Sequence, residues 1–148
     1  MKQYIAVILP VILLSMKSGS SKKDLLCHHW VQFASTSEIN APLKPIDPSM
    51  AEDITFKPEG TYQESIYNGQ MKTAGNWYLN DDQTKMEFMI SSLNGKAVPP
   101  FPETNRHYNI IILKLTADTL IYGHEFTRGK QGGPMVYNHS DLYFVRKD

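Results

Sequence analysis

The stretch TYQESIYNGQMKTAGNWYL, residues 61–79, predicts two antiparallel strands joined by a tight turn. Asn68 and Gly69 at its centre are residue types that tolerate the two positive φ angles of a type I′ hairpin turn. This turn sets three pairs on one face: Ile66 with Met71, Glu64 with Thr73, and Tyr62 with Gly75. Because this face is the more apolar one, we expect it to point into the core.

A second hairpin is predicted around Ala117 and Asp118. Regular pairing across that turn gives three further pairs: Leu115 with Leu120, Leu113 with Tyr122, and Ile111 with His124. This face is also mainly apolar, so we expect it to face the interior and to carry His124 with it. A slip of one residue would turn the whole set to the other face.

The rest of the chain follows the same alternation of apolar and polar residues. Its 8 Tyr, 6 Phe and 2 Trp favour strands, and no segment keeps a helical period, so an all-β fold is predicted. We expect eight strands, at residues 26–34, 52–57, 61–67, 71–79, 85–90, 107–115, 119–126 and 136–146. An alternative for residues 25–33 is a start as a short helix that caps one end of the fold.

The links between these strands alternate between long and short. Long links are expected at residues 35–51, 91–106 and 127–135, and short turns at 58–60, 80–84 and 117–118. In an up-and-down sheet, alternate links lie at opposite ends, so the three long links share one end. We therefore predict an eight-stranded antiparallel up-and-down barrel with one open end, whose interior has room for side chains or one small ligand.

The N-terminal residues have the pattern of a secretory signal peptide. Lys2 precedes an apolar run at residues 4–14, and Ser18-Gly19-Ser20 offers small residues for cleavage. The run is too short to span a bilayer, so no transmembrane segment is expected. We predict a signal peptide at 1–20 and one barrel domain at 21–148, exported to the periplasm or secreted.

Charge and cysteine content exclude several classes of protein. The 15 Lys and Arg balance the 15 Asp and Glu, which gives no basic surface for nucleic acid. The single cysteine, Cys27, has no partner for an internal disulfide. Leu26 before it and the lysines at 22 and 23 differ from a lipoprotein signal. We expect a buried or unreactive thiol at Cys27 rather than a lipid anchor.

Five short motifs occur in order along the chain: Ile54-Thr55-Phe56, Glu59-Gly60-Thr61-Tyr62, Gly75-Asn76-Trp77-Tyr78-Leu79, Leu115-Thr116-Ala117-Asp118-Thr119-Leu120 and Tyr143-Phe144-Val145-Arg146-Lys147. Together they resemble the lipocalin-like domains of small secreted bacterial proteins. The resemblance implies a β-barrel, export and a small hydrophobic ligand. It also implies that Trp30 near the start and Arg146 near the end pack together as a structural signature. Separately, no cofactor is expected.

The candidate ligand-binding residues lie toward the open end. Glu64 and His124 are the polar residues that the two registers turn inward, where a barrel built for stability alone would place apolar groups. The full candidate set is Tyr62, Glu64, Thr73, Tyr122, His124 and Phe126 inside, with Phe101, Arg106 and Arg128 at the mouth. The alternative is that Glu64 and His124 occupy rim positions with access to water.

Catalytic and metal sites are not expected. The registers separate His107 and His124 by about 13 Å along the sheet, too far apart to share a zinc ion. No GxSxG motif is present. Three hypotheses remain, in this order: a binding module for a small, largely apolar molecule; a structural or interaction domain with a filled core, whose long loops around Phe101 contact an envelope protein; and an enzyme that uses the same interior.

Overall fold

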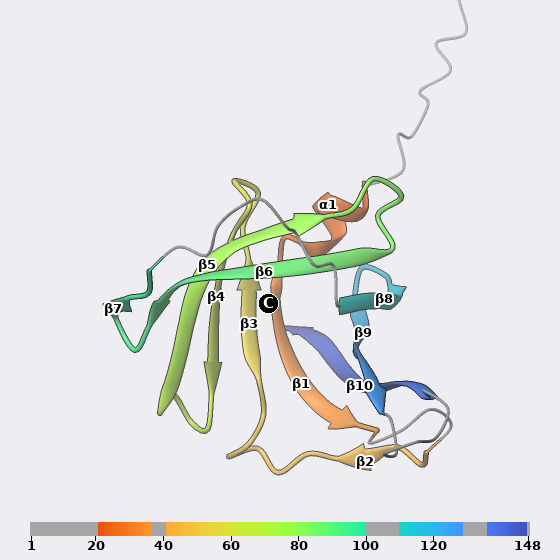
Figure 1. The fold of residues 1–148 in the computed structure, drawn as a ribbon. Coiled ribbons are helices and arrows are strands. Elements are labelled where there is room, and N and C mark those ends of the chain that lie inside the picture. The colour runs from red at the N-terminus through yellow and green to blue at the C-terminus, as the bar shows by residue number, and fades with distance from the viewer. Residues whose placement is uncertain (1–20, 37–40, 100–109, 129–135, 148) are drawn as a thin grey trace, which may run out of the picture.

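Eight antiparallel strands close into a barrel in the computed structural model, which describes residues 21–36, 41–99, 110–128 and 136–147 (Figure 1). The strands are β1 (His29–Ser35), β3 (Asp53–Phe56), β4 (Thr61–Ile66), β5 (Met71–Leu79), β6 (Lys85–Leu93), β8 (Ile110–Leu115), β9 (Thr119–Arg128) and β10 (Val136–Lys147). Neighbours in the sheet follow chain order, and β10 pairs back onto β1. The predicted eight-stranded up-and-down barrel is confirmed.

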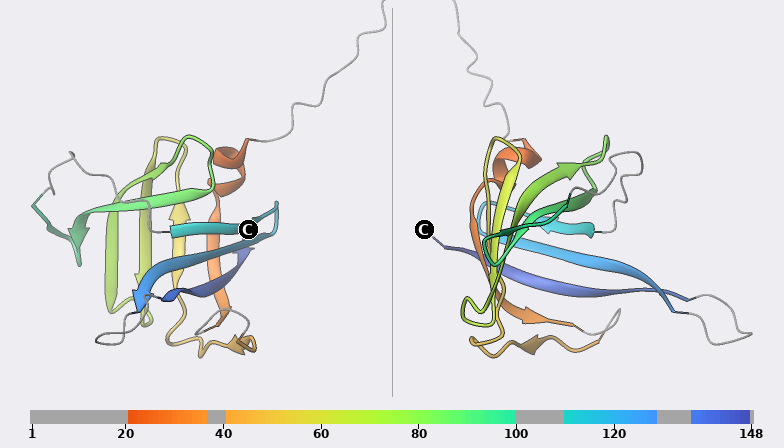
Figure 2. Two further views of the ribbon diagram at one scale, coloured as in Figure 1. Left: turned by 45° about the vertical axis from the view of Figure 1, so that its right-hand side comes forward. Right: turned by 60° about the vertical axis from the view of Figure 1, so that its left-hand side comes forward.

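Two short strands and one helix complete the described elements. β2 (Lys44–Pro45) pairs with β1, and β7 (Lys96–Ala97) pairs with β6, so both lie within links that the sequence predicts to be long. β9 and β10 form a long ribbon that reaches beyond the rest of the barrel (Figure 2). The predicted signal peptide lies outside the described residues.

The helix α1 (Lys22–Leu26) covers the end of the barrel that carries the short turns (Figure 1). A capping box starts it, because the Ser21 hydroxyl accepts from the Asp24 backbone N–H and the Asp24 carboxylate accepts from the Ser21 N–H, each at 3.1 Å. The Lys22 ammonium donates to the Gln83 carbonyl at 2.9 Å, which fastens α1 to the turn between β5 and β6. A short helix thus caps this end, as in the alternative for residues 25–33, but it lies at 22–26 and most of 25–33 belongs to β1.

The β4–β5 hairpin has the register that its turn predicts. Ile66 pairs with Met71, Glu64 with Thr73, and Tyr62 with Gly75. Asn68 and Gly69 take φ angles of 51° and 81°, and the Gln70 N–H donates to the Tyr67 carbonyl at 3.1 Å. Local turn chemistry thus fixes which residues of this hairpin face the interior.

The β8–β9 hairpin departs from regular pairing. Leu115 faces Leu120 as predicted, but a β-bulge between Ile112 and Lys114 shifts the residues beyond it. The other predicted pairs are therefore wrong: Ile112, rather than Leu113, faces Tyr122, and Ile110, rather than Ile111, faces His124. The extra residue in the bulge turns Leu113 outward, with 43% of its surface exposed, and lets Ile110 bury.

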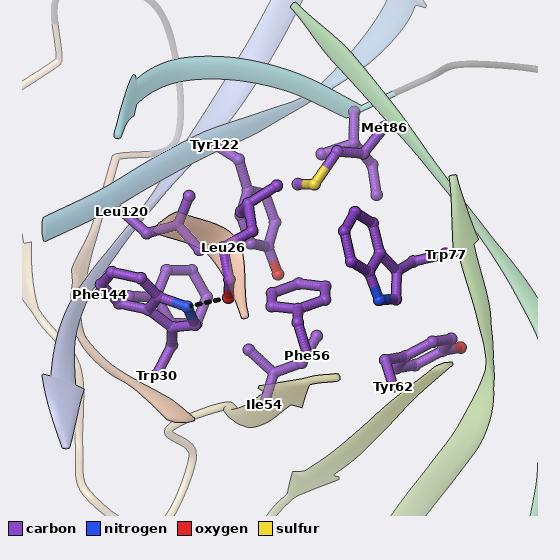
Figure 3. Packing of buried hydrophobic residues seen from close by; sticks show 11 residues of the cluster. Leu26, Trp30, Ile54, Phe56, Tyr62, Trp77, Met86, Leu120, Tyr122 and Phe144 are labelled. Carbon is purple, nitrogen blue, oxygen red and sulfur yellow. Dashed lines mark hydrogen bonds between the residues drawn. The ribbon is translucent and has the colours of Figure 1, made fainter. Parts of the chain in front are cut away.

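The core fills the end of the barrel beneath α1 (Figure 3). Aromatic and aliphatic side chains from α1 and the strand walls meet there: Leu26, Trp30, Ile54, Phe56, Tyr62, Trp77, Met86, Ile110, Leu120, Tyr122 and Phe144. The Trp30 indole N–H donates to the Leu26 carbonyl at 2.9 Å, so the helix end and the first strand satisfy each other. Inward-facing polar side chains therefore lie toward the opposite end of the interior.

Candidate functional site

Three of the predicted interior residues come together on β4 and β5. The Thr73 hydroxyl donates to the Glu64 carboxylate across the hairpin, and the Glu64 charge also acts on Tyr62. Thr73 and Tyr62 are buried, and Glu64 is half-buried. The contact between Glu64 and Thr73 follows from their direct opposition in the hairpin register.

A further carboxyl group, that of Glu52, belongs to the same place, and the sequence prediction missed it. Glu52 precedes β3 and is only 7% exposed. Its backbone N–H donates to the Gln32 side-chain carbonyl at 3.2 Å, and its carboxylate accepts from the Tyr122 hydroxyl. Glu52 shares the alternation of Ile54 and Phe56 and lies within the predicted strand 52–57, so the inward pattern of that strand would have found it.

The hydrogen bonds form two groups, one of Gln32, Glu52 and Tyr122 and one of Glu64 and Thr73. The Glu64 charge acts on both Glu52 and Tyr62, so the two groups and Tyr62 lie near one another. We call these six side chains the interior polar network: Gln32, Glu52, Tyr62, Glu64, Thr73 and Tyr122. Its members come from β1, the residue preceding β3, β4, β5 and β9.

The two glutamates, here called the carboxyl pair, have an unusual electrostatic environment. Burial, and to a smaller extent the nearby Glu64 charge, raise the pKa of Glu52 to about 8. The hydrogen bond from Tyr122 acts the other way, because it favours the ionised carboxylate. Glu52 is consequently protonated at neutral pH.

Aromatic rings wall the network on two sides. Tyr62 stacks on Phe88 with ring centroids 4.8 Å apart, and Tyr122 stacks on Phe144 at 4.9 Å. Burial raises the pKa of Tyr62 to about 12 and also raises that of Tyr122, so both phenols stay neutral hydrogen-bonding groups. Figure 3 shows the Tyr122 hydroxyl pointing into the barrel.

His124 lies next to the network on β9 but is exposed. Its ring meets Tyr122 edge-on, with centroids 5.8 Å apart. The protein on one side of the ring desolvates the imidazole and lowers its pKa, an effect that the Glu64 carboxylate opposes. His124 therefore lies near Glu64 but is exposed, as in the alternative of a rim position with access to water.

The other predicted site residues are placed in part or not at all. Phe126 and Arg128 lie on β9, where they pair with Asn138 and Val136, and only their backbone is described. Phe101 and Arg106 lie outside the described residues. The expected positions of Phe101, Arg106 and Arg128 at the mouth therefore stay predictions.

The expected structural signature is matched in register. Trp30 on β1 pairs with Arg146 on β10, and packing of the guanidinium against the indole stays a prediction. Trp30 is fully buried and Arg146 is exposed. A different cation lies over an indole at this end of the barrel, where the Lys23 ammonium sits 5.9 Å from the Trp77 ring.

Two hollows lie on the outer face of the sheet, a feature that the sequence analysis did not anticipate. Their volumes are about 400 and 320 Å³, and Asp53, Ser65 and Lys72 line both. These three residues form one row across β3, β4 and β5, with side chains that alternate with the inward ones. Asp53 Oδ1 lies 2.5 Å from His29 Nε2 beside this row. The larger hollow is also lined by Glu64 and Thr73, which belong to the interior polar network.

Metal ligands and a reactive thiol are not features of the described residues. Within residues 21–36, 41–99, 110–128 and 136–147, no group of three or more His, Cys, Asp or Glu side chains is placed to hold a metal ion. Cys27 is half-buried and packs against the core, and burial raises the pKa of its thiol. A raised pKa lowers the thiolate fraction, which agrees with the unreactive thiol expected from the sequence.

Comparisons with protein-family models, curated proteins and solved structures found no match. The strand order and the register pairs therefore define the barrel without reference to a relative. In the described part of the chain, no helix is both long and apolar enough to cross a membrane.

Proposed function

We propose that this chain is an exported, lipocalin-like barrel that binds a small, largely apolar molecule through its open end. The observation that carries the proposal is the interior polar network, which occupies positions where an apolar side chain would cost less to bury. In this assignment the stacked rings of Tyr62 and Phe88 contact the apolar body of the ligand. Glu64 and Thr73 bind its polar end.

The alternative is an interaction domain with a filled core, and one observation favours it. Phe33 and Val145 expose 42% and 44% of their surfaces on β1 and β10, and the Phe33 ring packs edge-on against Tyr143 at 6.3 Å. Exposed apolar side chains gathered on neighbouring strands are typical of protein contacts. The two candidates differ in whether a small molecule enters the barrel.

Native mass spectrometry of the full chain, purified without refolding from cells that make it, separates the two. Binding predicts an additional mass that is lost on denaturation. A second measurement uses the neutral fluorophore N-phenyl-1-naphthylamine as an apolar probe. Thr73→Phe fills the inward side of β5, whereas Ala74→Phe adds the same side chain to the neighbouring residue on the other face.

We expect Thr73→Phe to weaken probe binding at least about tenfold, a loss of roughly 1.4 kcal/mol, and Ala74→Phe to leave it nearly unchanged. Circular dichroism checks that both variants keep the barrel. A bare chain mass together with equal probe binding by both variants would reject the ligand-binding proposal and favour the interaction domain.

A further inference from the structure

The larger hollow on the outer face of the sheet lies over two neighbouring rows of side chains that cross β3, β4 and β5 (Figure 1). The members of each row pair with one another in register. The row nearer the β4–β5 turn holds Asp53, Ser65 and Lys72. The row beside it holds Thr55, Gln63 and Ala74, and continues onto β6 at Ser92. The shape of this hollow thus follows from the strand register.

Short side chains at the centre of these rows leave the space open. Ser65 and Ala74 lie on adjacent strands, and Gly95 lines the hollow from the β6–β7 turn. The volume of about 400 Å³ is within the range of small-molecule sites. Charged residues stand at the two ends of one row, since Asp53 and Lys72 are two strands apart, about 10 Å between Cα atoms.

Lys72 is held by its backbone, while its charge is unpaired. Its N–H donates to the Asn94 side-chain carbonyl at 2.8 Å, and its carbonyl accepts from the Asn94 N–H at 2.7 Å. Within the described residues, the Lys72 ammonium forms no ion pair. The side chain passes close to Gly69, where its Cε lies 3.4 Å from the position of an added Cβ. A fixed strand therefore presents a free cation at one end of the hollow.

The opposite end carries an oriented carboxylate. Asp53 Oδ1 lies 2.5 Å from Nε2 of His29, which holds the Asp53 side chain from the neighbouring strand β1. Within residues 21–36, 41–99, 110–128 and 136–147, His29 is the partner of this carboxylate, so Oδ2 is left to accept a hydrogen bond from a ligand. The hollow thus offers a donor cation and an acceptor anion at separate ends.

We propose that this outer hollow binds a small carboxylate that carries hydroxyl groups, such as a sugar acid. The Lys72 ammonium pairs with the ligand carboxylate, and Asp53 accepts from a ligand hydroxyl. Between them, the Ser65 hydroxyl and the Gln63 amide can each donate and accept, which suits hydroxyl groups. The site is separate from the binding of an apolar molecule inside the barrel and goes beyond it.

The residues that line the larger hollow also disfavour other ligands. Ala74 is the one apolar side chain among them, so an apolar body would gain little by burial there. Asp53 and Glu64 both line the hollow, and their carboxylates would repel a doubly charged phosphate more than a singly charged carboxylate. A neutral sugar would leave the Lys72 charge unused. A hydroxylated monocarboxylate satisfies all of these groups.

The test is an NMR titration of the full chain, purified without refolding, with D-glucuronate as probe. D-glucose is the matched neutral probe, and inorganic phosphate the doubly charged one. The ligand efficiency of small molecules puts the expected Kd for D-glucuronate at about 1 mM. We expect saturable shifts of the backbone amides in the two rows, and weaker binding of both D-glucose and phosphate.

Lys72→Gln and Lys114→Gln separate a local charge from a general one. Both remove one positive charge from an exposed lysine, but Lys114 lies on β8 and lines neither hollow. We expect Lys72→Gln to weaken D-glucuronate binding about three- to fivefold and to leave D-glucose binding unchanged. Lys114→Gln should leave both unchanged. The amide spectrum of each variant shows directly whether the barrel is folded.

Three results would overturn the proposal: no saturable shift in the two rows at about 10 mM D-glucuronate, equal D-glucuronate binding by both variants, or tighter binding of phosphate than of D-glucuronate. The variants avoid Glu64 and Thr73, which line this hollow and also belong to the interior polar network. Binding of N-phenyl-1-naphthylamine should be the same with and without saturating D-glucuronate. Failure at the outer hollow is thus distinguishable from failure of the interior site.

Discussion

Gly75 on β5 is the position where a single added methyl group should do most damage to the barrel. A Cβ atom built there lies 1.9 Å from the backbone carbonyl oxygen of Met89 and 2.8 Å from its carbonyl carbon. The approach is this close because a β-bulge between Ala74 and Gly75 draws β6 against β5. The atom in the way is backbone, so no side chain can rotate to make room.

The size of the effect of Gly75→Ala follows from that distance. An ordinary contact begins near 3.4 Å, so β5 and β6 must separate by about 1.5 Å. Such a shift breaks one or two backbone hydrogen bonds, each worth about 1 kcal/mol, and adds overpacking strain of about 1–3 kcal/mol. We expect a loss of about 3 kcal/mol in the free energy of unfolding, which corresponds to a fall in Tm of roughly 10 °C.

Gly95→Ala is the matched control, measured by urea unfolding beside Gly75→Ala and the wild type. Gly95 has no atom within 4 Å of an added Cβ, but its φ of +76° strains any other residue, so we expect a loss of about 1 kcal/mol. A Gly75→Ala barrel within about 0.5 kcal/mol of the wild type would refute the bulge and the β5–β6 register on which the collision depends.

Two further predictions probe the network and the β8 bulge. Tyr122→Phe keeps the stacked ring but removes the donor to Glu52, and should cost about 1–3 kcal/mol. Because that hydrogen bond favours the ionised form of Glu52, its loss raises the pKa of Glu52 further. The fall in the free energy of unfolding with rising pH, measured by urea unfolding, should therefore extend above pH 8. An unchanged pH profile would contradict this. In the same urea assay, Ile112→Ser should lower the free energy of unfolding by more than about 2 kcal/mol and Leu113→Ser by less than about 0.5 kcal/mol. Without the bulge, regular alternation would make Leu113→Ser the more damaging of the two.

The parts of the fold that the sequence predicted are those that local chemistry determines. The β4–β5 register depends on Asn68 and Gly69, whose positive φ angles select one turn, and the turn fixes every pair along the hairpin. The inward position of Glu64 and Thr73 follows directly from that register. The alternation of long and short links then predicted the barrel and its open end, because alternate links of an up-and-down sheet lie at opposite ends.

The parts that the sequence did not predict depend on contacts between distant segments. Nothing local to Leu113 marks it as a bulge; the bulge allows Ile110 to enter a core formed by strands from the whole chain. Glu52 was missed because a charged residue at a strand end is ordinarily solvated. Only the closed barrel brings Tyr122, 70 residues away, to its carboxylate.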